Sequence, residues 1–243
     1  MDMIETRGLS KQYGEKWAVR DLSLSVREGE LFSLLGVNGA GKTTTIRMLS
    51  GLSEPTSGEA FVSGFSCAGQ KREIKRIIGM SPQDTAVAER LTVRENLEFM
   101  ASVYGFDRPK VRERTERMIE DFHLEEVQAQ QARTLSGGWK RKLSIAMALI
   151  GEPKVLFLDE PTLGLDVLAR RELWRVIERM KGEITIVLTT HYMEEAEHLS
   201  DRLAVMLSGR IAFCGALPDL LSQTGAANLE DAFVAIAEQE VIA

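Results

Sequence analysis

The eight residues from Gly36 to Thr43 have the composition and spacing of a loop that cradles phosphate groups. They read Gly-Val-Asn-Gly-Ala-Gly-Lys-Thr and fit the pattern G-x-x-x-x-G-K-[ST]. Glycines let the main chain wrap an anion with its N–H groups, and the start of the following helix adds positive potential. We expect Lys42 to reach the β- and γ-phosphates of a nucleoside triphosphate and Thr43 to offer its hydroxyl to Mg²⁺. The expected binding residues are Gly36, Val37, Asn38, Gly39, Ala40, Gly41, Lys42, Thr43 and Thr44.

An acidic pair ends a fully apolar run. Val155–Leu158 is followed directly by Asp159 and Glu160. The carboxyl end of a parallel strand is where ligands bind in α/β folds, so Asp159 is expected to hold Mg²⁺, directly or through water. Glu160 is expected to activate the attacking water, a contribution of about 10²–10⁴ in rate. Taken alone, the pair also fits a polar strand end before the turn at Pro161, but the phosphate loop favours hydrolysis.

A third motif, Leu135-Ser136-Gly137-Gly138, stands shortly before the acidic strand and opens a predicted helix. Alone, Ser-Gly-Gly would indicate no more than a helix cap. Together with the phosphate loop, the acidic pair, Pro161–Asp166 and His191, it closely resembles the nucleotide-binding subunit of ABC transporters. The resemblance extends over nearly the whole chain, about residues 3–215.

The resemblance implies an α/β fold: a P-loop NTPase (RecA-like) core with a mostly parallel sheet, an N-terminal antiparallel β subdomain and an inserted α-helical subdomain. We expect a single domain, with its core at about residues 1–88 and 141–215. The helical insertion would span about residues 89–140, and a C-terminal tail about 216–243. ATP and Mg²⁺ are the implied ligands.

The family also implies that two such subunits, identical or different, meet head to tail with two ATP molecules between them. The phosphate loop of one chain would face Ser136, Gly137 and Gly138 of the other. The serine hydroxyl, the glycine N–H groups and the helix start would then point toward the γ-phosphate.

Four further positions match residues with known roles in the family. Tyr13 is similar to the aromatic residue that stacks on adenine. Gln83 is similar to the glutamine that contacts Mg²⁺ and water and relays the state of the γ-phosphate to the helical insertion. His191 is similar to the histidine that contacts the γ-phosphate and orients Glu160 and water. Asp166 is similar to the loop aspartate at the interface between subunits.

Three positions depart from the family pattern. Trp139 stands where glutamine is usual, which removes any contact made by that glutamine side chain. Leu163 replaces a frequent serine, and Val37 replaces a common proline in the phosphate loop, without loss of a donor.

These residues require a scaffold of alternating strands and helices. Apolar runs stopped by glycine or acidic residues predict strands, and apolar residues at helical spacing predict helices. The expected strands are Met3–Arg7, Trp17–Val26, Glu30–Leu35, Gly58–Ser63, Val155–Leu158, Ile184–Leu188, Leu203–Leu207 and Arg210–Phe213, the last two forming a hairpin. The expected helices are Lys42–Leu52, two within Leu91–Gln131, Ser136 to about Ile150, Ala169–Lys181 and a mildly helical tail after Pro218. The alternation predicts parallel strands with right-handed crossovers.

The composition and charge of the chain indicate which partners and metal sites to expect. The chain has 243 residues, 44% of them hydrophobic, and a net charge of −6, so nucleic acid is not an expected partner. The two cysteines lie far apart and near no histidine, which gives little support for a disulfide or zinc site. From the sequence we expect neither a secretion signal nor a bilayer-spanning run. We therefore expect a cytoplasmic protein, peripheral on the inner face of the cell membrane, that acts through separate transmembrane permease subunits.

Several local features resemble the ABC-2-type exporter subfamily. They are Leu91–Leu97, Tyr104-Gly105 and Asn228–Phe233. An importer ATPase is the alternative within the family. A soluble ABC-type ATPase of translation or DNA repair is another, although such proteins usually carry two cassettes or a long coiled coil. An ordinary P-loop kinase would offer no reason for Leu135–Gly138.

Overall fold

The computed structural model describes residues 2–242, which divide into two compact units. The first unit comprises the residues up to Lys75 and those from Lys181 onward, and the second unit comprises Arg76–Met180. Helix α2 (Lys71–Ile77) contains one of the boundaries between them. Each unit has its own strands, helices and buried side chains.

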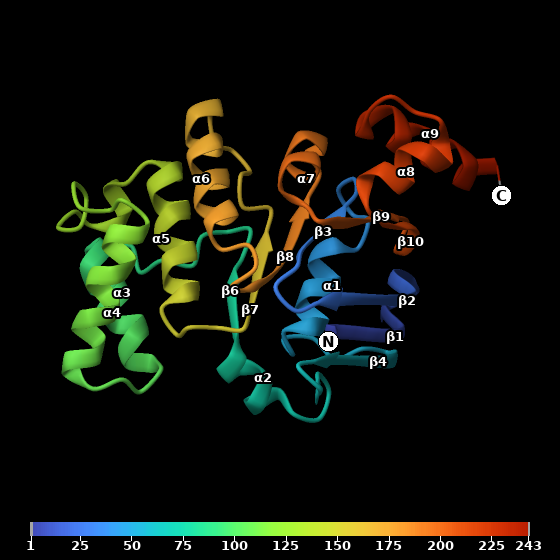
Figure 1. Cartoon of the computed structure of the whole chain (residues 1–243). Coiled ribbons are helices and arrows are strands. Elements are labelled where there is room, and N and C mark those ends of the chain that lie inside the picture. The colour runs from blue at the N-terminus through green and yellow to red at the C-terminus, as the bar shows by residue number, and fades with distance from the viewer. Residues whose placement is uncertain (1, 243) are drawn as a thin grey trace. The chain divides into compact units, whose positions relative to one another are not determined.

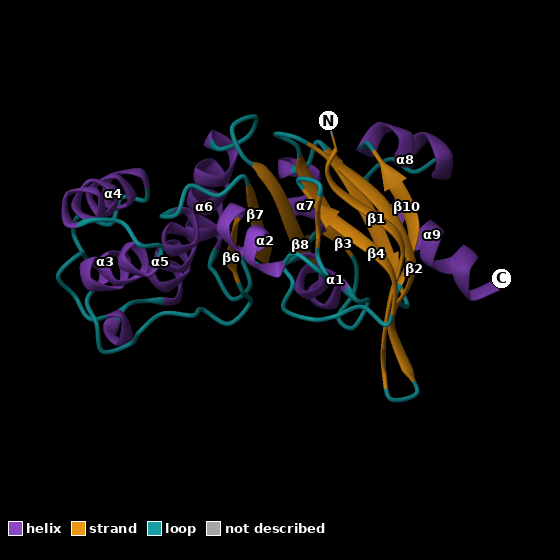
Figure 2. Ribbon diagram, turned by 90° about the horizontal axis from the view of Figure 1, so that it is seen from below, coloured by secondary structure: helices purple, strands orange, loops and turns teal. Residues whose placement is uncertain are grey.

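An antiparallel sheet occupies the N-terminal part of the first unit. Its strand order is β2-β1-β4-β5, and β1, β2 and β4 lie side by side in Figure 2. The strands are β1 (Asp2–Tyr13), β2 (Lys16–Arg27), β4 (Ser57–Val62) and β5 (Phe65–Ser66). The first strand is longer than the predicted Met3–Arg7, because shifts in the β1–β2 register interrupt the regular alternation of buried and exposed residues without ending the pairing.

A second group of strands, mostly parallel, forms the rest of the sheet structure in the first unit. Strand β3 (Leu31–Leu35) pairs in parallel with both β8 (Thr185–Thr190) and β9 (Arg202–Leu207). Every residue of β3 and β8 is buried, as is typical of strands covered on both faces. The predicted hairpin is confirmed: β10 (Arg210–Gly215) pairs antiparallel with β9, through Ser208-Gly209, both with positive φ.

Four helices complete the first unit. They are α1 (Lys42–Leu49), α7 (Met193–Leu199), α8 (Leu217–Thr224) and α9 (Leu229–Ile242). The last two form the helical tail expected after Pro218 and lie near β9 and β10 in Figure 1. Leu229 and Phe233 of α9 join Leu220 of α8 in one buried cluster with Val205 and Leu207 of β9.

The second unit combines a short parallel strand pair with a layer of helices. Strand β6 (Ile78–Ser81) pairs with β7 (Val155–Asp159). The helices are α3 (Val93–Val103), α4 (Arg108–Asp121), α5 (Gly137–Leu149) and α6 (Val167–Arg179), with a 3₁₀ turn at Ala132–Thr134. Helices α3, α4 and α5 lie side by side (Figure 1). The two helices predicted within Leu91–Gln131 are therefore present, whereas β6 was not predicted.

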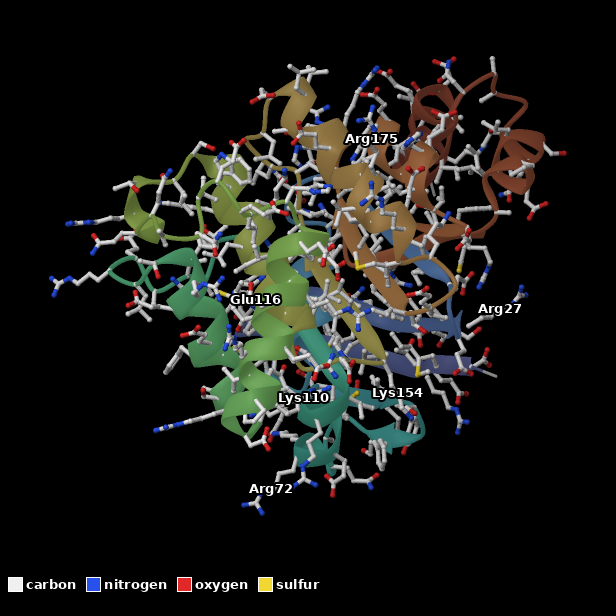
Figure 3. The ribbon with its side chains drawn as sticks, turned by 60° about the vertical axis from the view of Figure 1, so that its left-hand side comes forward. Arg27, Arg72, Lys110, Glu116, Lys154 and Arg175 are labelled. Atoms are coloured by element: carbon white, nitrogen blue, oxygen red, sulfur yellow. The ribbon has the colours of Figure 1, made fainter. Side chains whose placement is uncertain are left out.

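Charged side chains link α3 to α4. Arg94 donates two hydrogen bonds to the carboxylate of Glu116, at 2.8 and 3.1 Å, and holds the pKa of that carboxyl below its ordinary value. Glu116 and Lys110 both project from α4 (Figure 3).

Within residues 2–242, none of the helices combines enough length with enough apolar character to cross a bilayer.

The packing of β6 against α5 gives a test of stability. A Cβ at Gly79 would lie 2.2 Å from the carbonyl oxygen of Ala148. Gly79→Ala should therefore lower the free energy of unfolding by about 2–3 kcal/mol, measured by urea denaturation. Gly69→Ala is the matched control, because the nearest atom to its new Cβ would be Ser66 Oγ at 3.8 Å. Equal stability of the two variants would show that α5 does not press on β6 at this point.

Candidate functional site

The phosphate loop connects β3 to α1 in the first unit. The side chain of Lys42 is buried, and its ammonium group donates to the carbonyl oxygens of Gly36 at 2.7 Å and Val37 at 3.3 Å. The tip of the loop, from Val37 to Gly39, is exposed. The lysine thus lies against the main chain of the loop that it is expected to serve.

Two glycines give the loop its shape. A Cβ at Gly36 would lie 2.5 Å from the carbonyl oxygen of Met206, and one at Gly41 would lie 2.5 Å from that of Ala18. Gly41 also has a φ of +107°, which residues with side chains rarely adopt. As the N-cap of α1 it offers no side-chain cap to the first N–H groups of that helix. This arrangement suits an anionic ligand such as a phosphate group.

His191 directly follows strand β8, beside the phosphate loop. The N–H group of Gly36 donates to the carbonyl oxygen of Thr190 at 3.3 Å, and Leu35 pairs with Thr190 in the parallel register. The loop and His191 therefore follow the carboxyl ends of two adjacent parallel strands. The imidazole ring packs on Tyr192, with 4.2 Å between ring centroids.

Tyr13 lies at the end of β1, also in the first unit. Its side chain is 50% exposed, and the ammonium group of Lys11 lies 5.1 Å from its ring centroid. That ammonium group also donates to the carbonyl oxygen of Glu54 at 2.6 Å. An exposed ring held in this way is suited to stacking on a planar base.

The acidic pair lies in the second unit, where β7 ends. Asp159 and Glu160 are 2% and 5% exposed, and Glu160 has a φ of +50°, which is uncommon for a residue with a side chain. Ser81 of β6 pairs with Leu158 of β7, so the strands end at the same level. Gln83 follows β6 by two residues and is exposed. The register therefore brings Gln83 and the acidic pair to one edge of the strand pair.

Two helix starts meet in the second unit. Ser136 caps α5, as predicted, by accepting from the N–H group of Trp139 at 3.5 Å. Asp166 caps α6 by accepting from the N–H groups of Leu168 and Ala169 at 2.9 and 3.0 Å. A Cβ at Gly138 would lie 3.4 Å from that of Ala169. A Cβ at Gly137 would meet open space, so this helix start is accessible.

Trp139 packs with a charged pair that links these helices. The ammonium group of Lys142 lies 4.6 Å from the centroid of the Trp139 ring and 2.9 Å from a carboxylate oxygen of Glu172 on α6. The aromatic ring that replaces the usual glutamine thus forms a cation–π contact.

The expected magnesium ligands come from both units. Thr43 belongs to the first unit, and Gln83 and Asp159 belong to the second. Hydroxyl, amide and carboxylate oxygens are the donors that Mg²⁺ prefers, so the chemistry of this set fits the ion. When bound, Mg²⁺ would neutralise charge on the phosphate oxygens.

Two residues that hold the segment after β6 were not predicted. Arg141 of α5 donates to the carbonyl oxygens of Pro82 and Gln83. Asn96 of α3 accepts from the N–H group of Ala88 at 2.8 Å and donates to its carbonyl oxygen at 3.1 Å. No local pattern signals either contact, since the Arg141 partners lie 59 and 58 residues away in sequence.

Comparison with known sequences gives consistent matches. The profile of the ABC transporter family matches residues 19–163. The human protein named phospholipid-transporting ATPase ABCA3 is 44% identical over 227 residues, which cover 92% of this chain. The chain spans only 13% of the length of that relative.

Solved structures match over most of the chain. One described as the ATP-binding subunit of an ABC transporter has a TM-score of 0.87 and 32% identity, covering 97% of this chain and 99% of that chain. A bacterial ABC transporter cassette, solved as a dimer, has a TM-score of 0.81 and 25% identity, covering 88% of this chain and 99% of that chain.

The contact between Gly41 and Ala18 predicts how the phosphate loop responds to a single methyl group. Gly41→Ala should reduce the affinity for inorganic triphosphate by more than about tenfold, because the loop must deform to relieve both the contact and the positive φ. Isothermal titration calorimetry measures this affinity. Gly225→Ala is the control, because this glycine also has a positive φ, +69°, but lies in open space at the end of α8, and this variant should keep the parent affinity. If Gly41→Ala also binds as the parent does, the loop is not the phosphate site.

Proposed function

Because the chain belongs to the ABC transporter family and is an ATPase domain of that family, we propose that it binds two ATP molecules between two copies and uses their hydrolysis to drive transport through membrane-spanning partners. The observation that carries this proposal is the phosphate loop, whose glycines lie against neighbouring main chain and whose lysine is buried against it. On this proposal the protein works at the inner face of the cell membrane.

Within one copy, the residues from Gly36 to Thr44 hold the phosphates and Tyr13 stacks on the adenine. Lys42 then exchanges its contacts with the carbonyl groups of the loop for contacts with the β- and γ-phosphates. Thr43, Gln83 and Asp159 supply the oxygen ligands for Mg²⁺. The exposure of Tyr13 and the accessible tip of the loop support these assignments.

Hydrolysis requires a base beside the attacking water. Glu160 takes this role, because its buried carboxylate at the end of β7 stands where ligands bind in folds of this class. His191 contacts the γ-phosphate and orients Glu160 and the water. Gln83 completes the set by contacting the water and Mg²⁺.

The second copy closes the site. Ser136, Gly137 and Gly138 present a hydroxyl group, N–H groups and the positive end of α5, a 13-residue helix whose start is accessible. Asp166 lies beside them at the start of α6 and takes part in the interface. The dimeric cassette that resembles this chain supports such an assembly. ATP favours the closed dimer because it binds that state more tightly than the open one.

Transport needs a membrane-spanning partner, either a separate permease or a further part of a longer chain. Gln83 and the α3–α4 layer transmit closure to this partner, and the exposed Phe99 and Val103 of α3 offer it an apolar contact. The exporter-like motifs favour export over import. The name of the phospholipid-transporting relative favours a lipid as the substrate.

Removing the proposed base separates binding from hydrolysis. Glu160→Gln should lower kcat for ATP by at least about 10²-fold, since a glutamine cannot accept the proton. The variant should still form dimers with ATP and Mg²⁺ in size-exclusion chromatography. Glu183→Gln, at an exposed glutamate before β8, is the matched control and should turn over normally. Normal hydrolysis by Glu160→Gln would exclude Glu160 as the base.

The head-to-tail dimer predicts a specific crosslink. One chain carries Asn38→Cys and the other Ser136→Cys, both in a Glu160→Gln, Cys214→Ser background. The remaining native thiol, Cys67, is buried, which raises its pKa to about 12 and keeps it unreactive. A short dithiol crosslinker should join the two chains only with ATP and Mg²⁺, as read on non-reducing gels. Pairing Asn38→Cys with Ser102→Cys should give no product, and equal crosslinking of both pairs would contradict the proposed dimer.

A further inference from the structure

One face of α5 packs along β6 and along the loop that comes after this strand and contains Gln83. Ala148, Ser144 and Arg141 lie on this face at helical spacing. The carbonyl oxygen of Ala148 approaches Gly79, and the hydroxyl groups of Ser144 and Ser81 are 2.9 Å apart. Helix α5 therefore touches β6 along its length and reaches the Gln83 loop one turn before Ser144.

The contact with the Gln83 loop is made by a guanidinium group. The Arg141 side chain is buried, 4% exposed as a residue, and donates to the carbonyl oxygen of Pro82 at 2.6 Å and to that of Gln83 at 2.5 Å. Hydrogen bonds from a charged donor are among the stronger ones in proteins. The planar fork of arginine can hold two neighbouring acceptors at once, which a lysine cannot do in the same geometry.

The same helix carries the motif expected to meet the partner's nucleotide. Ser136 caps α5 five residues before Arg141, within about one and a half helical turns. A helix of this length moves as a rigid element, so a displacement of the Gln83 main chain is transferred through Arg141 to the start of α5. The other buried cation of this helix, Lys142, binds Glu172 on α6 instead.

We propose that Arg141 is a positioning residue that couples the two nucleotide sites of the dimer. It ties Gln83, which senses the nucleotide bound by its own chain, to the Ser136 helix start, which meets the nucleotide bound by the partner chain. This inference rests on the proposed function. The coupling is reciprocal, so occupation of either site favours the closed arrangement at the other.

Steady-state ATP hydrolysis by the full chain, measured against ATP concentration, tests this coupling. The parent should show a Hill coefficient approaching about 2, the number of sites. Arg141→Lys keeps the charge but not the fork, and should lower the Hill coefficient toward about 1. It should also lower kcat, because fewer dimers close around both nucleotides. The affinity of monomeric protein for a fluorescent ATP analogue should stay unchanged, because the phosphate loop is intact. Arg141→Gln should show the same pattern more strongly.

The control is Lys142→Gln, which removes a comparably buried cation from the same helix without touching the Gln83 loop. It should lower the midpoint of thermal unfolding about as much as Arg141→Gln does, yet keep the parent Hill coefficient. Parent-like kcat and Hill coefficient in Arg141→Lys would overturn the coupling role, as would an equal loss of cooperativity in Lys142→Gln. A parent Hill coefficient near 1 would also overturn the coupling, whereas failure of the proposed function is a separate result, seen as normal turnover by Glu160→Gln.

Discussion

The phosphate loop keeps its shape because two of its glycines lie directly against carbonyl groups of other strands. Gly36 faces Met206 in β9, and Gly41 faces Ala18 in β2. Any side chain at these positions would push the loop away from the sheet structure that supports it. The ability of the loop to present N–H groups to a phosphate therefore depends on close main-chain packing, and Lys42 completes this packing from within the loop.

In the second unit, a glycine packed against a carbonyl group brings a helix close to a strand. Gly79 allows α5 to approach β6 so closely that Ser144 and Arg141 reach the end of that strand and the loop beyond it. The carboxylates at the end of β7 and the glutamine that follows β6 are placed by the parallel register of the two strands. Both proposed halves of the site are thus set by main-chain geometry, and the reactive side chains are added to it.

The sequence predicted those parts of this arrangement that depend on local patterns. The buried strands β3 and β7 were recognisable as apolar runs, and the serine cap of α5 was recognisable from its spacing. The β9–β10 hairpin followed from Ser208-Gly209. Strand β6 was missed because four residues containing a glycine and a serine carry no clear periodicity. The contacts of Arg141 were missed because its partners are distant in sequence, and a lysine–arginine run after a helix start usually indicates a solvated face.

The C-terminal helices support the phosphate loop, although that loop lies near the start of the sequence. Leu229 and Phe233 of α9 pack in one cluster with Val205 and Leu207, the two neighbours of Met206 in β9. Since the carbonyl group between them supports Gly36, the tail braces the phosphate loop from behind. Anything that loosens α9, whether a truncation or a protein that binds it, would change nucleotide affinity without touching a single ligand-binding residue.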